Sequence, residues 1–160
     1  DPVLFLEHKG LYRQGYASSN EPDKNYLLEF GKANIVQTGE DLTIVTWGAI
    51  VQKSIEASRN LDCSVEIIDL RTLNPLDIDT ILDSIKKTNR LIIAHEDNIT
   101  NGFGGEILSQ VIEKGFEFLD APIKRVASKD APVPYASVLE DEILVQTDWI
   151  SDAVNEIMEY

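Results

Sequence analysis

Apolar residues fall in short runs that alternate with longer stretches of helical periodicity over most of the chain. Residues 42–47, 65–70 and 90–95 are rich in β-branched and other apolar side chains, which is typical of buried strands. A shorter run at 123–126 predicts a fourth such strand. The opening run, 3–6, is apolar as well and is predicted as a short strand.

Helical spacing follows each of the first three internal runs. After Gly48, an apolar stripe continues one turn at a time through Val51 and Ile55. In the second stretch, Asn74 is the expected N-cap and Pro75 the expected first helical residue. Three apolar stripes predict the buried faces of the second, third and last helices: Ile78, Ile81, Leu82, Ile85; Ile107, Leu108, Val111, Ile112, Phe116, Leu119; and Trp149, Ile150, Ala153, Val154, Ile157, Met158.

The repeated order of strand and helix predicts the fold class. Parallel strands need crossover connections, and helices in those connections cover the faces of the sheet. We therefore expect an α/β fold with three layers, in which a mostly parallel sheet has helices on both faces. Residues 132–135 contain two prolines and predict an extended loop before the last helix.

Charge excludes two classes of partner. The 160 residues contain 28 Asp and Glu against 14 Lys and Arg, a formal net charge of −14. Nucleic acid and anionic membrane surfaces are poor partners for such a chain.

The single cysteine, Cys63, cannot form an internal disulfide or a thiolate cluster. No apolar run approaches the roughly 20 residues of a membrane span, and we expect a cytoplasmic protein. Because Met158 is the only methionine, we expect a piece of a longer protein.

Two neighbouring motifs are the candidate ligand or interface site. Gly102, Gly104 and Gly105 lie between a predicted strand and a predicted helix, where backbone N–H groups can hold an anion. However, Ile107 replaces a glycine of the dinucleotide fingerprint and no Walker lysine follows, so a tight turn is favoured over phosphate binding. His95 and Glu96 lie at the carboxyl end of a strand, where open α/β sheets bind ligands. A structural contact, ligand binding and acid–base chemistry all remain open for this histidine.

Several motifs in this order resemble one enzyme family. FLEHKGLYR (5–13), IDLRTLNPLD (68–77), DAPIKRV (120–126) and PVPYA (132–136) are similar to the carboxyl-terminal part of the beta subunit, or beta region, of thiamine-diphosphate-dependent 2-oxoacid dehydrogenases. The resemblance implies a transketolase C-terminal-like domain over 35–160, a linker over 14–34 and the tail of a pyrimidine-binding domain over 1–13. The branched-chain (2-oxoisovalerate) and pyruvate enzymes resemble the chain most, and the WGA sequence at 47–49 leans toward the branched-chain type.

The resemblance also implies what the chain lacks and what it binds. The parent enzyme would use thiamine diphosphate and magnesium, but the Gly-Asp-Gly cofactor motif is absent from this sequence. We therefore expect no catalytic, cofactor-binding or metal-binding residue here. The implied role is subunit assembly, with possible regulation, and the implied partners are an alpha subunit or alpha-like region, a second beta subunit and the subunit-binding domain of the lipoyl acyltransferase.

The resemblance further implies that the basic subunit-binding domain of the acyltransferase binds to the acidic carboxyl-terminal end of this chain. The residues predicted to form this docking surface are Asp120, Ile157 and Tyr160. Two alternatives remain open. One is a small-molecule-sensing domain with its ligand near His95 and Gly102, and the other is the carboxyl-terminal domain of a transketolase or a deoxyxylulose-phosphate synthase.

Overall fold

One five-stranded sheet forms the centre of the protein. The computed structural model describes residues 2–160, and the strands lie in the order β1-β3-β2-β4-β5. Strands β2 to β5 are parallel to one another, whereas β1 pairs antiparallel with β3 at one edge. The strands are β1 (Asn34–Gln37), β2 (Leu42–Thr46), β3 (Val65–Asp69), β4 (Leu91–Asn98) and β5 (Lys124–Ser128).

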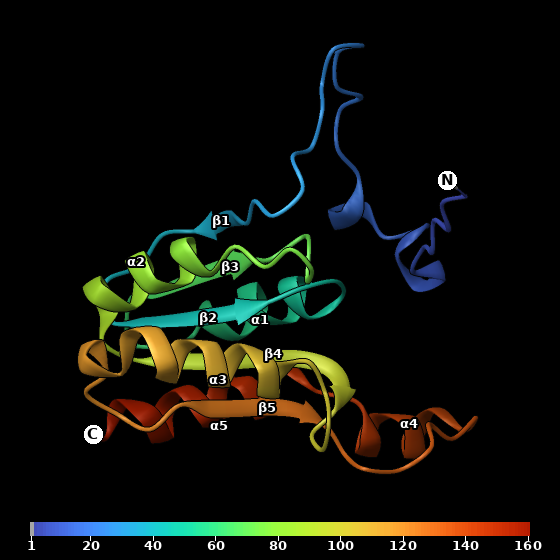
Figure 1. The fold of residues 1–160 in the computed structure, drawn as a ribbon. Helices are drawn as coiled ribbons and strands as arrows, with labels where there is room; N and C mark the ends of the chain where they lie inside the picture. Colours follow the sequence, from blue (N-terminus) through green and yellow to red (C-terminus); the bar gives the residue numbers. More distant parts are fainter. Residues whose placement is uncertain (1) are drawn as a thin grey trace.

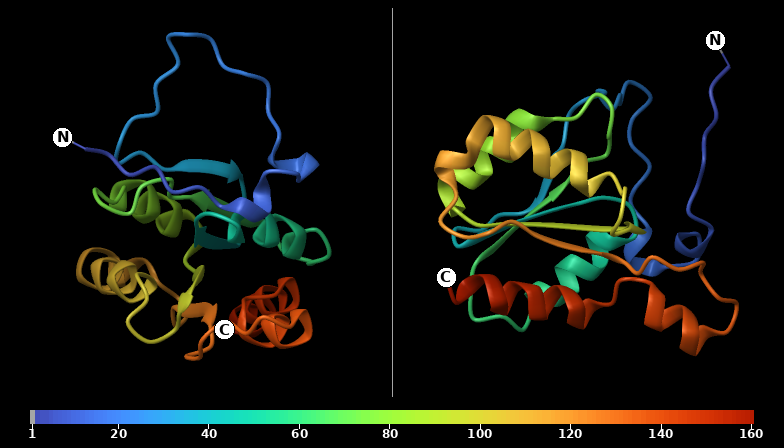
Figure 2. Two further views of the ribbon diagram at one scale, coloured as in Figure 1. Left: turned by 90° about the vertical axis from the view of Figure 1, so that its right-hand side faces the viewer. Right: turned by 60° about the horizontal axis from the view of Figure 1, so that its bottom comes forward.

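Helices cover both faces of this sheet (Figures 1 and 2). Buried side chains of α1 and α5 pack on one face, and those of α2 and α3 pack on the other. The helices are α1 (Ile50–Ser58), α2 (Ile78–Thr88), α3 (Gly104–Gly115), α4 (Ser137–Ile143) and α5 (Thr147–Met158). Short 3-10 turns occupy Lys9–Leu11, Gly15–Ala17 and Phe116–Phe118. The prediction of a three-layer α/β fold with a mostly parallel sheet is confirmed.

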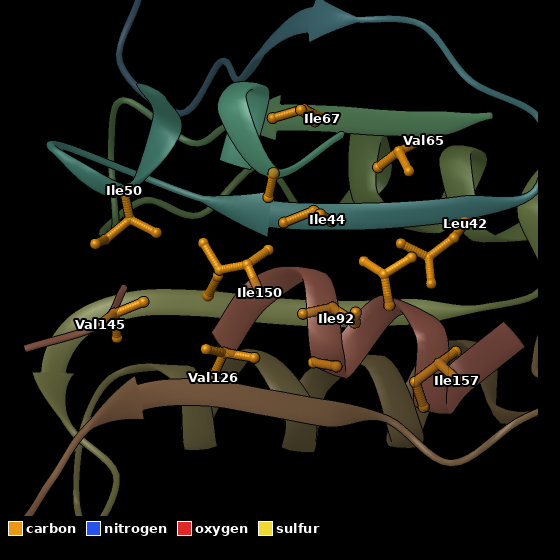
Figure 3. Close-up of a cluster of buried hydrophobic side chains, with 14 of the residues drawn as sticks. Leu42, Ile44, Ile50, Val65, Ile67, Ile92, Val126, Val145, Ile150 and Ile157 are labelled. Atoms are coloured by element: carbon orange, nitrogen blue, oxygen red, sulfur yellow. The ribbon is translucent and has the colours of Figure 1, made fainter. Parts of the chain in front are cut away.

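Alternation along the strands divides the core into two halves. Successive strand residues point to opposite faces, so Ile44 packs toward α1 and α5 while Val45 packs toward α2 and α3. Figure 3 shows the first half, where Ile92 and Val126 of the sheet meet Ile150 of α5. Because both faces are covered, the central strand β2 is buried at every position.

One expectation about strands is corrected, and one strand was not expected. Residues 3–6 form no strand and are exposed, because no neighbouring strand pairs with them; the whole segment before β1 extends away from the sheet (Figure 1). Strand β1 lies partly where the linker was expected. Its four residues are mostly half-buried and its pairing with β3 contains an irregularity between Ile35 and Gln37, so the apolar alternation that marks a strand is too short to recognise.

The expected start of the second helix is also wrong. Asn74 and Pro75 lie in the loop after β3 and are joined by a cis peptide bond. Asp77 is the N-cap instead, because its carboxylate accepts hydrogen bonds from the Thr80 N–H at 3.3 Å and from the Ala33 N–H at 2.9 Å. The cap therefore fixes the start of α2 and also holds the segment that leads into β1.

Two further differences concern the carboxyl-terminal half. Helix α3 ends at Gly115, and the Phe116 side chain, expected in its buried stripe, is 67% exposed in a 3-10 turn. The helix α4 was not expected, because no residue of it is buried and an apolar stripe is the main signal of a helix. None of the helices described over 2–160 is both long and apolar enough to cross a membrane.

Candidate functional site

The carboxyl ends of β2 and β4 form the crevice where a ligand is expected in this kind of sheet. These strands are neighbours, and the chain leaves β2 toward α1 on one face but leaves β4 toward α3 on the other. Trp47, directly after β2, lies in this position. Its ring stacks on His95 with centroids 5.1 Å apart and meets Phe103 edge-on at 6.2 Å. An aromatic cluster therefore takes the place at which an open α/β sheet usually holds its ligand.

His95 is completely buried at the base of this cluster. Neither ring nitrogen has a hydrogen-bond partner within residues 2–160. Burial lowers the pKa of the imidazole below its usual 6.5, and the charge of Asp97 opposes this in part. Burial therefore favours the neutral imidazole.

The glycines of the turn allow the backbone to pass closely over the His95 ring. A Cβ at Gly102 would lie 2.7 Å from the imidazole Cε1 and 2.2 Å from the carbonyl oxygen of Asn98. At Gly104 a Cβ would lie 2.4 Å from the imidazole Nε2. These contacts explain two of the three glycines by close packing, as the tight-turn interpretation predicts.

Glu96 does not join His95, although the two are adjacent in sequence. Its side chain is more than a third exposed, and its carboxylate lies 3.6 Å from the His8 Nε2 of the amino-terminal segment. Neighbouring residues of a strand point to opposite faces, which separates the pair that the motif places side by side. The acid–base interpretation of this pair therefore lacks its geometry.

A cleft of about 780 Å³ lies beside the aromatic cluster, between the loop after β3 and the start of α3. Gly102 and Gly105 contribute to its wall, together with the side chains Leu73, Asn74, Leu76, Asn101, Phe103, Glu106, Gln110 and Arg125. Sequence reasoning missed Arg125. On β5, Arg125 faces the α3 side of the sheet because its neighbour Val126 packs toward α1 and α5. The sequence contains no local signal that this strand lies beside the start of α3.

The predicted docking residues lie elsewhere. Asp120 precedes β5 and Tyr160 ends the chain, so both are at the edge of the sheet where the parallel strands begin (Figure 1). Both are exposed, as a docking role requires. Ile157 is corrected: its side chain is 1% exposed and belongs to the core between α5 and the sheet, because it falls on the apolar stripe of that helix.

The residues present do not fit a diphosphate held by a metal ion. Over the described part of the chain, no group of three or more His, Cys, Asp or Glu side chains is placed to bind a cation. Magnesium sites depend on carboxylate and other oxygen ligands around the phosphates. We therefore assign no step of thiamine chemistry to these residues.

Comparison with known proteins extends over the whole chain. The sequence is 42% identical over 161 residues to "Pyruvate dehydrogenase E1 component subunit beta, mitochondrial" of Dictyostelium discoideum, covering 98% of this chain and 45% of that protein. It is 37% identical over 163 residues to the protein named "Pyruvate dehydrogenase E1 component subunit beta" of Staphylococcus aureus, covering 100% of this chain and 49% of that protein. The chain thus spans about half the length of these relatives.

Fold and family agree with these similarities. A solved structure described as "Split gene transketolase, inactive beta4 tetramer" superposes with a TM-score of 0.74 at 20% identity, covering 86% of this chain and 45% of the other. Residues 31–150, more than half of the chain, match the family model described as "Transketolase, C-terminal domain". The chain belongs to the transketolase C-terminal domain family.

Proposed function

We propose that this chain is an assembly domain of the decarboxylating component of a 2-oxoacid dehydrogenase. The parent reaction would be the oxidative decarboxylation of a 2-oxo acid with acyl transfer to a lipoyl acyltransferase. One observation carries this proposal: the likeness to proteins named pyruvate dehydrogenase E1 subunit beta covers 98–100% of this chain but only about half of theirs. The remaining half of such a protein, with its partner subunit, would supply the thiamine diphosphate and magnesium site.

Exposed apolar side chains support an assembly role. Val3, Leu4, Phe5 and Leu6 are each more than 80% exposed, and Leu27 and Phe30 are similarly open. A second group, Val133, Tyr135, Val138 and Leu139, lies on α4 and the loop before it. Large contiguous apolar surfaces on a water-exposed protein mark contacts with other chains or domains. The amino-terminal group would face the missing part of the parent, and the group around α4 would face a neighbouring subunit.

The acidic surface supports docking of a basic partner. The chain carries a net charge of −14, and Glu140, Asp141 and Glu142 are placed together on the short helix α4. Complementary charge raises association rate and specificity more than affinity, and salt screens it. We infer that the basic subunit-binding domain of the acyltransferase binds at α4. Asp120 and Tyr160 lie at the opposite end of the sheet and form a second candidate contact surface.

The substrate of the parent enzyme is a finer proposal. The names of the relatives favour pyruvate. The Trp47–Ala49 sequence favours an enzyme of the branched-chain type, and this preference stays a prediction. In this chain Trp47 packs on His95 inside the aromatic cluster, which gives the tryptophan a structural role.

The test is the mass of the 160-residue chain in solution, alone and with the subunit-binding domain, at about 50 mM and 500 mM salt. A complex that forms at low salt and weakens at high salt is the expected result. A triple variant, E140Q/D141N/E142Q, should bind more weakly, whereas D79N/D83N/E113Q removes three exposed carboxylates on α2 and α3 and should bind as before.

Two results would overturn the proposal. Equal binding by both triple variants would remove the acidic docking surface. Decarboxylation of pyruvate or 2-oxoisovalerate by the 160-residue chain with thiamine diphosphate and magnesium would show a catalytic fragment. The transketolase alternative shares this fold, and it predicts no complex with the acyltransferase domain at either salt concentration.

A further inference from the structure

Arg125 is a cation without a carboxylate partner in an acidic protein. No Asp or Glu oxygen in the range 2–160 lies within 4.0 Å of its guanidinium, although the net charge is −14. Its Nη1 donates a hydrogen bond to the Ile99 carbonyl at 2.8 Å. This contact fixes the guanidinium in place, and its remaining N–H groups are free to bind an anion.

Arg125 also lies close to the amino end of a helix. Its Nη1 lies 3.7 Å from the Cβ position of Gly105, in the first turn of α3. The amino end of a helix carries a partial positive charge and unpaired N–H groups, so a fixed cation beside it is unfavourable unless an anion lies between or near them. The guanidinium and the first turn of α3 therefore lie together at the cleft wall, with the Glu106 carboxylate in the same turn.

His95 provides a second, independent observation at the same turn. It is fully buried and neither of its nitrogens is paired within the described residues. The Nε2 edge of its ring faces Gly104, the first residue of α3. An unpaired polar group in the interior is costly, and such groups commonly mark a functional position rather than a packing one. A buried imidazole without a partner therefore lies beneath the turn at the start of α3, next to the cleft that Arg125 lines.

The walls of the cleft indicate the rest of the ligand. Leu73, Leu76 and Phe103 give it an apolar side, and the amides of Asn74 and Asn101 are polar groups that can meet an oxo or hydroxyl oxygen. A volume of about 780 Å³ lies within the usual range for small-molecule sites. Glu106 also lines the cleft, and its negative charge opposes any anion there, one with two charges more strongly than one with a single charge.

We propose that this cleft binds a small monocarboxylic acid, whose carboxylate pairs with Arg125 at the start of α3 and whose apolar part contacts Leu73, Leu76 and Phe103. A planar carboxylate matches the two parallel N–H groups of a guanidinium. The site lies at the carboxyl edge of the sheet, away from Asp120 and the carboxyl terminus (Figure 1). None of its lining residues belongs to the docking surface proposed above.

The experiment is a titration of the ¹⁵N-labelled 160-residue chain, followed by the amide signals of Asn101, Gly102, Gly105 and Glu106. The probes are pyruvate, 3-methyl-2-oxobutanoate, inorganic phosphate and, as an uncharged control, isobutyramide. Both carboxylates should shift these signals with saturation, phosphate should bind at least ~5-fold more weakly, and the amide should have no effect.

Charge variants make the test specific. R125Q should weaken carboxylate binding ~10-fold or more, and E106Q should strengthen it ~2–5-fold. The matched control is K114Q, which removes one positive charge from the last turn of the same helix and should change affinity less than ~2-fold. Near-ultraviolet circular dichroism shows whether each variant keeps its packing; if R125Q unfolds after losing its bond to Ile99, E106Q decides the question.

The overturning results are definite. Titrations without saturable shifts at the start of α3, equal affinity of the chain and a folded R125Q, or an E106Q variant that binds no tighter would each refute a carboxylate site. Phosphate binding tighter than both carboxylates would refute the monocarboxylate assignment and indicate a phosphate ligand instead.

Discussion

Glu66 and His95 are both buried polar residues, but they differ in their hydrogen-bond partners. Glu66 is 1% exposed, and its carboxylate accepts hydrogen bonds from Ser84 and from the Lys87 Nζ at 2.5 Å. Burial alone would raise the pKa of this carboxyl, but the bonds from Lys87 and Ser84 bring it below its usual 4.5. His95 has no such partners. The glutamate therefore behaves as part of the scaffold, whereas the histidine keeps hydrogen-bonding capacity that the fold does not use.

His95 should make the stability of the protein depend on pH. Because burial lowers the pKa of the folded imidazole below the usual 6.5, the unfolded chain binds the proton more tightly. The free energy of unfolding is therefore highest above pH 6.5 and falls as the pH drops below it toward the folded pKa. H95L should show a smaller decrease between pH 7 and pH 5 in urea unfolding, and its stability at pH 8 should lie within ~1 kcal/mol of the parent.

His8 supplies the control for this measurement. It is the other histidine of the chain, and its side chain is 45% exposed beside Glu96. H8Q removes this exposed imidazole, and its urea unfolding curves provide the comparison for those of H95L. If the free energies of unfolding of H95L and the parent fall in parallel between pH 7 and pH 5, the buried imidazole contributes nothing to the pH dependence of stability.

Among the elements, β2, β3, β4 and their helices follow from periodicity because both faces of the sheet are buried. The elements that sequence reasoning missed, β1 and α4, have little or no buried surface and depend on contacts with distant parts of the chain. Asp77 shows the same limit at a helix end: its bond to the Ala33 N–H joins residues 44 positions apart, which no local pattern contains.

The candidate site divides in the same way. The placement of His95 and the glycine turn at the carboxyl edge of the sheet could be predicted, since strand ends and turn glycines are local features. The stacking of Trp47 on His95 and the approach of Arg125 to Gly105 could not, because each joins separate strand–helix units. Ile157 was misplaced on the surface because a charge argument about the whole carboxyl end was applied to a residue of the apolar stripe.

Asp77 should contribute to stability through the start of α2. Its carboxylate accepts from both the N–H and, at 2.8 Å, the hydroxyl of Thr80, besides the Ala33 N–H. D77A should lower the free energy of unfolding by about 1–2 kcal/mol in urea denaturation. D79A, two residues later and exposed in the same first turn, should change it by less than ~0.5 kcal/mol. Equal losses in the two variants would show a general charge effect at the helix end rather than a cap.

At the scale of the whole molecule, stability and surface character lie in different parts of the chain. All fully buried residues belong to the sheet, its helices and their connections after β1, whereas the segment before Gly31 exposes most of its large apolar side chains. The segment touches the folded unit through weak contacts such as His8 with Glu96 at 3.6 Å. A domain with this distribution folds by its own core and presents the segment to another part of a larger assembly.

Deleting residues 1–30 should therefore leave the folded unit intact. The expected change in the free energy of unfolding is within ~1 kcal/mol, because none of the described residues 2–30 is buried and Gly31 keeps its hydrogen bond to the Thr72 hydroxyl. Deleting residues 1–38 is the matched comparison: it also removes β1 and exposes the edge of β3, where Ile67 and Ile68 are fully buried, and should cost at least ~3 kcal/mol. Urea unfolding of both variants measures this difference. Comparable losses in the two would mean that the amino-terminal segment is part of the stabilising core, and the exposed apolar residues at 3–6 would then no longer argue for a contact with another domain.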